Sequence, residues 1–251
     1  MTARPYVLLS VATSADGYID DTGPRRLVLS NEADLDRLDQ ARAECDAILI
    51  GATTLRRDNP RLVVKSAERR AGRVAGGLPP FPLKVTITGS GDLDPGLRFW
   101  HHGGDKLVYC PDAMVPKLRE RLGERAEIAG LGTKLDVAAV LGDLHSRGIG
   151  RLMVEGGESI HTQFLTAGLA DEIHLAIAPF FIGDPAAPRF VGSGVFPNGP
   201  ENRMALAEAR AVGDVAFLRY LVREVHEGHE VHQGHAAGGV YEVGDVEEEG
   251  R

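Results

Sequence analysis

The chain is poor in cysteine, which excludes several classes of small protein. Its 251 residues contain two cysteines, Cys45 and Cys110, which lie far apart and form no Cys-x-x-Cys motif. A disulfide framework needs more cysteines, and a zinc site needs closely spaced cysteine or histidine ligands. We therefore expect no metal centre. A composition of 43% hydrophobic residues is sufficient for an ordinary hydrophobic core.

Long apolar runs are also missing. The sequence has no window of about 18 uncharged apolar residues, the length that a membrane-spanning helix needs. The first residues, MTARPYVLLSVATSADG, contain a short apolar run that soon meets polar residues and an acid. They lack the basic segment, the long apolar stretch and the cleavage site of a signal peptide. We expect a cytoplasmic protein with no membrane partner.

A surplus of basic residues is absent as well. The net charge is −8, and residues 224–251 contribute −7 of it through eight acidic residues and one arginine, so the other 223 residues carry −1. A nearly neutral body without a basic stripe argues against nucleic acid as the main partner. It is compatible with one anionic small molecule in a local pocket.

The acidic segment 224–251 also differs from the rest of the chain in its histidines. His226, His229, His232 and His235 recur at every third residue. This spacing is compatible with binding a divalent metal, but a glycine-rich acidic segment without apolar periodicity predicts disorder. We expect residues 1–223 to form one domain and residues 224–251 to form a disordered tail.

The pattern of hydrophobic residues predicts strands that alternate with helices. Strands are predicted at residues 6–13, 46–51, 62–64, 83–88, 106–110, 151–155 and 172–179, and helices at 31–44, 116–122, 137–146 and 159–167. Residues 52–60 predict a turn or short helix, residues 66–82 a surface loop, and residues 203–222 a hairpin around Val212-Gly213-Asp214. This order predicts an α/β protein with a mainly parallel sheet flanked by helices and an antiparallel C-terminal hairpin.

Polar and glycine-rich segments follow four of the predicted strands, where α/β folds bind their ligands. They are Ser14-Ala15-Asp16-Gly17, Gly51-Ala52-Thr53-Thr54, Thr88-Gly89-Ser90-Gly91 and Glu155-Gly156-Gly157. Each alone is explained by the needs of a turn, but four at one edge of a sheet indicate a binding site. The segment at 88–91 is not the dinucleotide fingerprint, because Asp94 replaces its third glycine and no helix follows directly.

The two glycines at 156 and 157 stand where a buried strand passes into a helix. Glycine pairs at such places let a large group, often a phosphate, approach the backbone. The N–H groups from Gly157 to about Ile160 would have no partner within the helix and would be free to bind phosphate oxygens.

The segment GATTLRRDNPRLVVK contains a second candidate site. Asp58 and Asn59 precede Pro60, so the chain must turn and hold both side chains in fixed directions. An Asx turn is the simpler interpretation. Polar contacts to a ring or ribose are the functional one, with Lys65 available for an anion.

These segments are similar to the reductase domain of the bacterial riboflavin-pathway deaminase/reductase, a member of the dihydrofolate reductase-like fold. The resemblance runs from about Tyr6 to Val222. It depends on SADGYI, RAECDAILIGATTLRRDNPRL, TGSGDLDP and LMVEGGESIHTQFLTAGLADEIHLAIAPFFIG. It implies a dihydrofolate reductase-like sheet, NADPH as cofactor and a homodimer. The H-x-E and P-C-x-x-C motifs of the zinc deaminase are absent, so the resemblance implies a reductase that stands alone.

The resemblance also implies a role for individual residues. The cofactor would contact Thr54, Asp58, Ser90, Gly156, Gly157, Glu158, Ser159 and Ile160, with residues 157–163 at its phosphates. The substrate would contact Arg42, Leu62, Lys65 and Glu155, together with Asn59. Asp58 and Glu155 are the candidate catalytic acids, with water or the substrate phosphate as the alternative proton source. Lys65 and Val28 depart from the family, which has arginine and often tryptophan at these places.

The implied reaction is hydride transfer to C1′ of a ribosylamine. The expected function is NADPH-dependent reduction of a pyrimidine ribosyl 5′-phosphate, whose ribosylamino group becomes ribitylamino, as in riboflavin biosynthesis. Two alternatives remain open. One is a reductase of the same fold that acts on dihydrofolate, another pterin or a precursor of a specialised metabolite. The other is a nucleotide-binding protein that has kept the fold and lost the chemistry.

Overall fold

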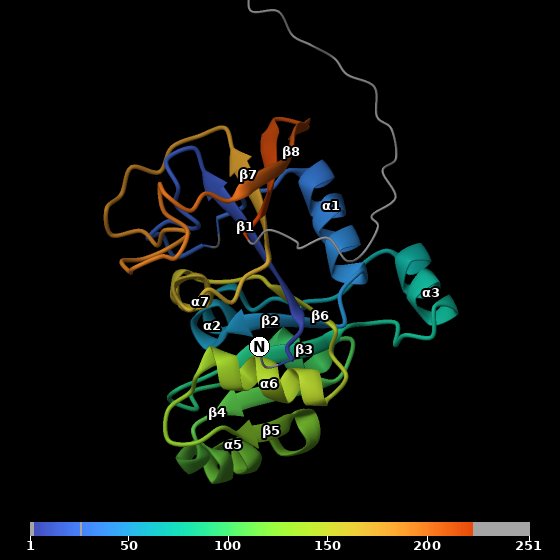
Figure 1. Cartoon of the computed structure of the whole chain (residues 1–251). Coiled ribbons are helices and arrows are strands. Elements are labelled where there is room, and N and C mark those ends of the chain that lie inside the picture. The colour runs from blue at the N-terminus through green and yellow to red at the C-terminus, as the bar shows by residue number, and fades with distance from the viewer. Residues whose placement is uncertain (1–2, 26, 223–251) are drawn as a thin grey trace, which may run out of the picture.

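A nine-stranded sheet with the order β5-β4-β3-β2-β6-β1-β7-β9-β8 forms the centre of the computed structural model, which describes residues 3–25 and 27–222 (Figure 1). The strands are β1 (Tyr6–Ser14), β2 (Ala47–Gly51), β3 (Leu83–Ile87), β4 (Lys106–Cys110), β5 (Glu127–Gly130), β6 (Arg151–Val154), β7 (Glu172–Ala178), β8 (Ala205–Val212) and β9 (Val215–Leu221). All pairs from β5 to β7 are parallel, whereas β9 pairs antiparallel with β7 and β8. The predicted mainly parallel sheet with a C-terminal hairpin is confirmed. The predicted tail and its histidines lie outside the described residues.

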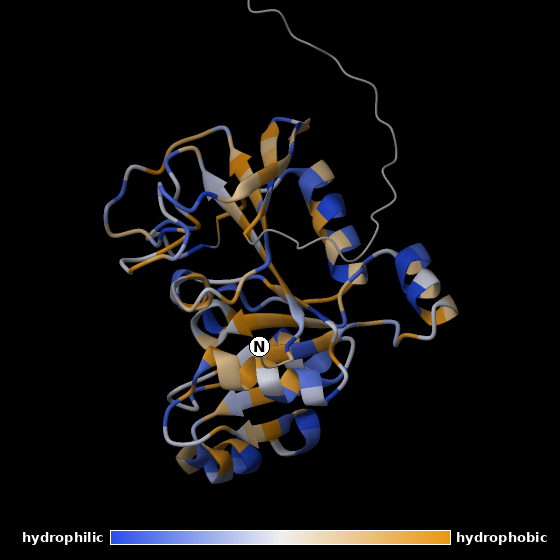
Figure 2. Ribbon diagram, viewed as in Figure 1, coloured by the Kyte–Doolittle hydropathy of each residue, from blue (hydrophilic) through white to orange (hydrophobic). Residues whose placement is uncertain are grey.

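Helices cover both faces of the sheet. They are α1 (Glu32–Ala43), α2 (Ala52–Asp58), α3 (Ala67–Ala75), α4 (Arg98–His101), α5 (Val115–Leu122), α6 (Val137–Ser146) and α7 (Glu158–Thr166), with short 3-10 turns at Asp112–Met114 and Gly123–Arg125. Alternate residues of the central strands enter two apolar clusters, one containing α6 and α7 and the other α2 and α5. Strand β2 is therefore buried at every position and apolar along its length (Figure 2). Every helix in the described ranges is too short or too polar to cross a lipid bilayer.

The start of α1 is linked to the hairpin β8–β9. Asn31 caps the helix by accepting the N–H of Asp34 at 2.8 Å. Its side-chain amide also donates to the carbonyl of Val212 and to Asp214 Oδ1, both at 2.7 Å. A Cβ on Gly213 would lie 2.5 Å from Asn31 Nδ2, and this glycine has φ +63°. The hairpin turn therefore needs glycine both for its backbone and for this contact.

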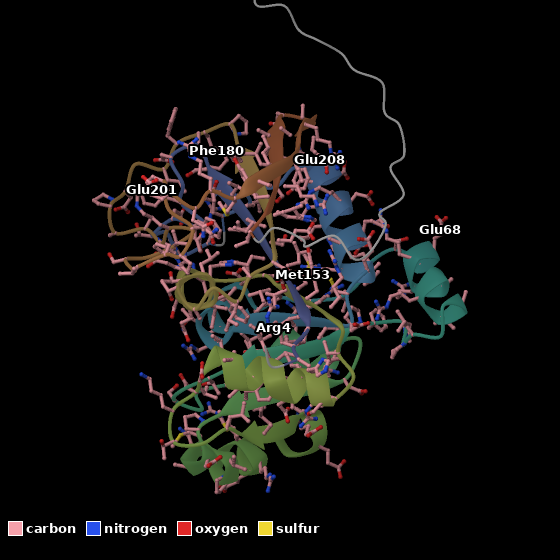
Figure 3. All side chains as sticks on the ribbon, in the orientation of Figure 1. Arg4, Glu68, Met153, Phe180, Glu201 and Glu208 are labelled. Carbon is pink, nitrogen blue, oxygen red and sulfur yellow. The ribbon has the colours of Figure 1, made fainter. Side chains whose placement is uncertain are left out.

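The prediction of a surface loop at residues 66–82 is wrong for its first half, which forms α3. Ser66 caps the helix, and Arg69 binds Asp36 and Asp39 of α1 at 2.7 and 3.0 Å. Arg73 is buried and donates to two carbonyl oxygens near the end of α1. The glycines and prolines of residues 66–82 predict a loop, but the contacts of Arg69 and Arg73 with α1 stabilise a helix in the first half of this segment. Glu68 lies on the outer side of α3 (Figure 3).

The strand predicted at residues 62–64 is also wrong. Leu62 has φ +51°, which a strand does not accommodate, although Leu62 and Val64 are buried as the apolar pattern predicts. The sequence analysis did not predict β5 and α4. Both are four residues long, too short for a periodic pattern.

Candidate functional site

A cavity of about 1020 Å³ lies at the C-terminal edge of the sheet. Strands β3, β2 and β1 and the residues after β6 contribute to it, with α1, α2, the start of α7, and residues 27–30 and 185–188. Helices α2 and α7 lie next to each other at this edge (Figure 1). The cavity is at the upper end of the size of ligand pockets. Three of the four predicted strand-end segments line it.

The fourth segment, at Ser14–Gly17, supports a neighbouring loop and does not line the cavity. Asp16 accepts the N–H groups of Ile182 and Gly183 at 3.1 and 2.8 Å. Together with the Ser14 hydroxyl, these bonds hold the pKa of Asp16 below its usual value. The residues of this segment are therefore explained by the turn that they form, without a role in ligand binding.

The two glycines before α7 let the starts of α2 and α7 come into contact. Gly156 and Gly157 have φ +120° and +73°, a region that side chains other than glycine rarely adopt. A Cβ on Gly157 would lie 2.7 Å from Thr54 Oγ1 of α2. On the other side, a Cβ on Gly51 would lie 2.7 Å from Ile160 of α7. Glycine is thus required by the approach of the two helices.

The first turn of α7 presents backbone donors at the cavity. The N–H groups of Gly157, Glu158 and Ser159 donate to no other residue in the described part of the chain. The N–H of Ile160 differs from the prediction, because it donates to the carbonyl of Gly157 at 3.1 Å. Free N–H groups at the positive end of a helix dipole bind phosphate or another anion.

The Glu158 carboxylate binds the backbone of a neighbouring segment. Its Oε2 accepts the N–H of Arg189 at 2.6 Å. One turn later, Thr162 Oγ1 accepts the N–H of Gly192 at 2.8 Å. Both bonds attach the segment after β7 to α7, beside the cavity residues 185–188. Glu158 thereby positions one wall of the site.

Glu155 is the acid at the end of β6 and lines the cavity. Arg42 of α1 binds it with two hydrogen bonds of 2.6 Å, one from Nε and one from a terminal nitrogen, to the two carboxylate oxygens. The side chains are 11% and 13% exposed. Burial disfavours the charged guanidinium, but Glu155 outweighs this and raises the pKa of Arg42. The fork holds the carboxylate in one orientation.

The remaining predicted residues fall into two groups. Thr54, Asp58, Ser90 and residues 156–160 line the cavity, as does Gln163. Arg42, Asn59, Leu62 and Lys65 do not line it. Asn59 Oδ1 accepts the N–H of Arg98 at 2.7 Å, Leu62 belongs to the core, and Lys65 is exposed. The substrate roles of these four residues stay predictions.

Helix α1 contributes cavity residues that the sequence analysis missed. Asp34 is 1% exposed and accepts Arg37 Nε at 2.7 Å. The Arg37 guanidinium contacts His174 Nδ1 at 3.3 Å and lies 4.3 Å from the ring centre of Phe217. Both α1 residues line the cavity beside Leu35 and Leu38. The sequence feature that could have identified Asp34 and Arg37 as site residues is their position next to the apolar face of the predicted helix.

The residues that follow β3 and β5 line another part of the cavity. Ser90 follows β3, and residues 133–135 follow β5. The Thr88 hydroxyl accepts the N–H of Gly91 at 3.0 Å and shapes this turn. Within residues 3–25 and 27–222, no three histidine, cysteine or acidic side chains are placed to hold a metal ion.

Comparison with known proteins identifies a family of similar chains. The model of the RibD C-terminal domain matches residues 5–218. The 2,5-diamino-6-ribosylamino-4(3H)-pyrimidinone 5′-phosphate reductase of Archaeoglobus fulgidus is 39% identical over 187 residues, 74% of this chain and 85% of that protein. The protein of the same name from Methanothermobacter thermautotrophicus is 32% identical over 222 residues, 88% of this chain and 99% of its own length.

A solved structure gives the same fold. RibD of Acinetobacter baumannii superposes with a TM-score of 0.71 at 20% identity, over 87% of this chain and 58% of that one. The predicted dihydrofolate reductase-like architecture and the predicted family are both confirmed. The chain belongs to the RibD C-terminal domain family.

Proposed function

We propose that the chain is an NADPH-dependent reductase that converts the ribosylamino group of a pyrimidine ribosyl 5′-phosphate to a ribitylamino group. The names of the two relatives at 39% and 32% identity support the substrate class. One structural observation carries the proposal. A single cavity combines the free N–H groups at the start of α7 with a carboxylate that Arg42 holds in place.

The residues of the cavity fit a nicotinamide dinucleotide. The N–H groups of residues 157–159 suit phosphate oxygens, and Gly157, which the close approach of Thr54 requires to be glycine, has no side chain to cover this backbone. Thr54 and Ser90 add hydroxyl groups on two neighbouring strand ends. When bound, the cofactor supplies the hydride that reduces C1′ of the substrate imine.

The acids of the cavity serve the substrate. Both oxygens of Glu155 accept from Arg42, so the carboxylate is oriented to accept further hydrogen bonds from the amino or ring N–H groups of an aminopyrimidine. Asp58, at the end of α2, lines the same cavity. We assign Asp58 or water to deliver the proton that the imine nitrogen takes up as C1′ accepts the hydride.

The activity is tested by following absorbance of the reduced nicotinamide with purified protein and three substrates. These are the deaminated pyrimidine ribosyl phosphate, its diamino precursor and dihydrofolate. We expect steady oxidation with one of the pyrimidines and none with dihydrofolate. With Asp58 as the proton donor, Asp58→Asn should lower kcat by about 100-fold, whereas with water as the donor kcat should stay close to that of the wild type. Oxidation with dihydrofolate alone would replace the proposed substrate class, and NADPH binding without turnover would favour a nucleotide-binding protein.

The choice of NADPH over NADH is supported by cations at the Ser90 end of the cavity. Arg56 and Lys134 both line it. Neither forms an ion pair with any residue that the structure describes; Arg56 donates to the carbonyl of Asp92 and to the Thr53 hydroxyl. Two uncompensated cations favour the additional phosphate of NADPH.

Replacing Lys134 with alanine is expected to lower kcat/KM for NADPH by about tenfold, the effect of one charged hydrogen bond, and to leave NADH unaffected. Initial rates with both cofactors measure this ratio. Lys117→Ala is the matched control, because Lys117 donates to the carbonyl of Ser90 at 3.3 Å without lining the cavity. An equal loss with both cofactors would show that Lys134 does not bind the additional phosphate of NADPH.

We also propose that the protein is a homodimer. Light scattering, which measures the mass of the particle in solution, would test this.

A further inference from the structure

His161 is a cavity residue to which the proposed reaction assigns no role. It stands on the first turn of α7, four residues after Gly157, whose carbonyl accepts its backbone N–H at 3.0 Å. Its side chain lines the cavity but is 1% exposed. A buried polar side chain at a ligand site is expected to have hydrogen-bond partners.

One of its ring nitrogens has none. Nδ1 is buried and makes no hydrogen bond to any residue in the described ranges. The ring packs edge-on against Phe190, with ring centres 5.2 Å apart. The other nitrogen, Nε2, lies on the side of Gly156, 3.3 Å from the position that a Cβ there would take. The imidazole therefore packs against an apolar ring and a glycine turn, and among the described residues no acid or base is hydrogen-bonded to it.

This environment determines the state of the ring. Burial lowers the pKa of His161 to about 4, so the imidazole is neutral at physiological pH. A neutral imidazole carries one N–H donor and one acceptor nitrogen. Buried N–H groups without an acceptor are rarer than acceptors without a donor. The proton is therefore better placed on Nε2, beside Gly156, which leaves the unpartnered Nδ1 as an acceptor.

We propose that His161 is a cofactor-binding residue whose Nε2–H donates a hydrogen bond to an oxygen of the nicotinamide dinucleotide at the Gly156-Gly157 turn. The inference rests on the proposed use of such a cofactor. The oxygen belongs to the pyrophosphate or to the nicotinamide carboxamide, and both accept from a neutral N–H. The donor extends the row of free N–H groups at residues 157–159. A dry site strengthens such a bond.

Three substitutions test the donor. His161→Phe keeps the ring against Phe190 without polar atoms, His161→Gln can place an amide N–H near the position of Nε2, and His161→Asn ends near Nδ1. Calorimetric titration would measure the Kd for NADPH and for its fragment without nicotinamide, 2′-phospho-ADP-ribose. Phe and Asn should weaken NADPH binding by about tenfold, and Gln should recover most of the loss. The unfolding temperature of the Phe variant should equal or exceed that of the wild type, because an unpartnered buried polar atom is removed.

The fragment distinguishes the two oxygens. An equal loss for NADPH and the fragment identifies a pyrophosphate oxygen, whereas a loss for NADPH alone identifies the carboxamide. Nitrogen NMR of histidine-labelled protein reports the ring directly, with the His161 signals assigned by their absence from the Phe variant. We expect the proton on Nε2 in the free protein and a shift of the Nε2 signal on addition of NADPH.

A folded Phe variant with the wild-type Kd would overturn the proposal. So would a proton on Nδ1, or an Nε2 signal that NADPH leaves unchanged. If the wild type still binds NADPH and reduces the pyrimidine, these results remove the role of His161 and leave the proposed function intact. If the wild-type protein binds neither NADPH nor NADH, both the role of His161 and the proposed function are wrong.

Discussion

Gly157→Ala is expected to lower kcat/KM for pyrimidine reduction at least about 100-fold, because a displacement of 1 Å in a binding site can have this effect. The new Cβ would lie 2.7 Å from Thr54 Oγ1, and φ at this position is +73°. The chain must therefore shift the first turn of α7 away from α2. This shift moves the N–H groups of residues 157–159, which are the proposed phosphate donors. Titration with NADPH should show a matching rise in Kd.

The cost of a positive φ can be separated from the other effects of this substitution. Gly148 has φ +83° and no atom within 4 Å of its potential Cβ. Gly148→Ala should therefore lose about 1 kcal/mol of folding free energy through strain alone, with the Kd for NADPH unchanged. Gly157→Ala should lose about 1–3 kcal/mol more, because its ψ of 170° adds strain for any residue but glycine and because the new methyl group overpacks the contact with α2. Equal losses of stability in urea titrations of the two variants would mean that the contact between α2 and α7 tolerates a methyl group.

Arg42→Met is expected to lower the free energy of unfolding by about 3 kcal/mol, because it leaves a nearly buried carboxylate without its partner. Glu155 is 11% exposed and takes both of its hydrogen bonds of 2.6 Å from Arg42. The same variant should lose most of its pyrimidine reductase activity, since nothing then orients Glu155. Chemical denaturation and initial rates measure the two effects independently.

A double variant distinguishes the two roles of this pair. Arg42→Met combined with Glu155→Leu removes both charges, which is often close to neutral for stability. We expect the double variant to regain most of the unfolding free energy and to remain inactive with the pyrimidine. It should still bind NADPH, because the α7 donors are unchanged. Reductase activity close to that of the wild type would show that Glu155 makes no essential contact with the substrate.

Local patterns in the sequence were sufficient for most of the fold. An all-apolar run such as residues 47–50 predicts a strand covered on both faces, and β2 is buried at every position. The helix predicted at residues 31–44 forms α1, and the predicted turn around Gly213 joins β8 to β9. The exceptions depend on distant contacts. Helix α3 forms in a segment rich in glycine and proline because Arg69 and Arg73 bind groups on α1.

Some features of the candidate site also follow from local sequence patterns, whereas others depend on distant contacts. The sequence by itself determined that β2, β3 and β6 end in polar, glycine-rich turns, and a parallel sheet brings such ends to one edge. It also determined that a helix begins after Gly157, with free backbone donors. These features depend on backbone conformation over a few residues.

The tertiary structure alone decided which side chains reach the cavity. Glu155 is paired with Arg42, 113 positions away. The left-handed backbone at Asn59 and Leu62 directs them to Arg98 and the core, whereas Asp34 and Arg37 line the site from α1. The partner of a charged or buried polar group depends on how distant elements pack. A local pattern carries no information about that distance, so His161 and its unpartnered nitrogen became visible only in the folded chain.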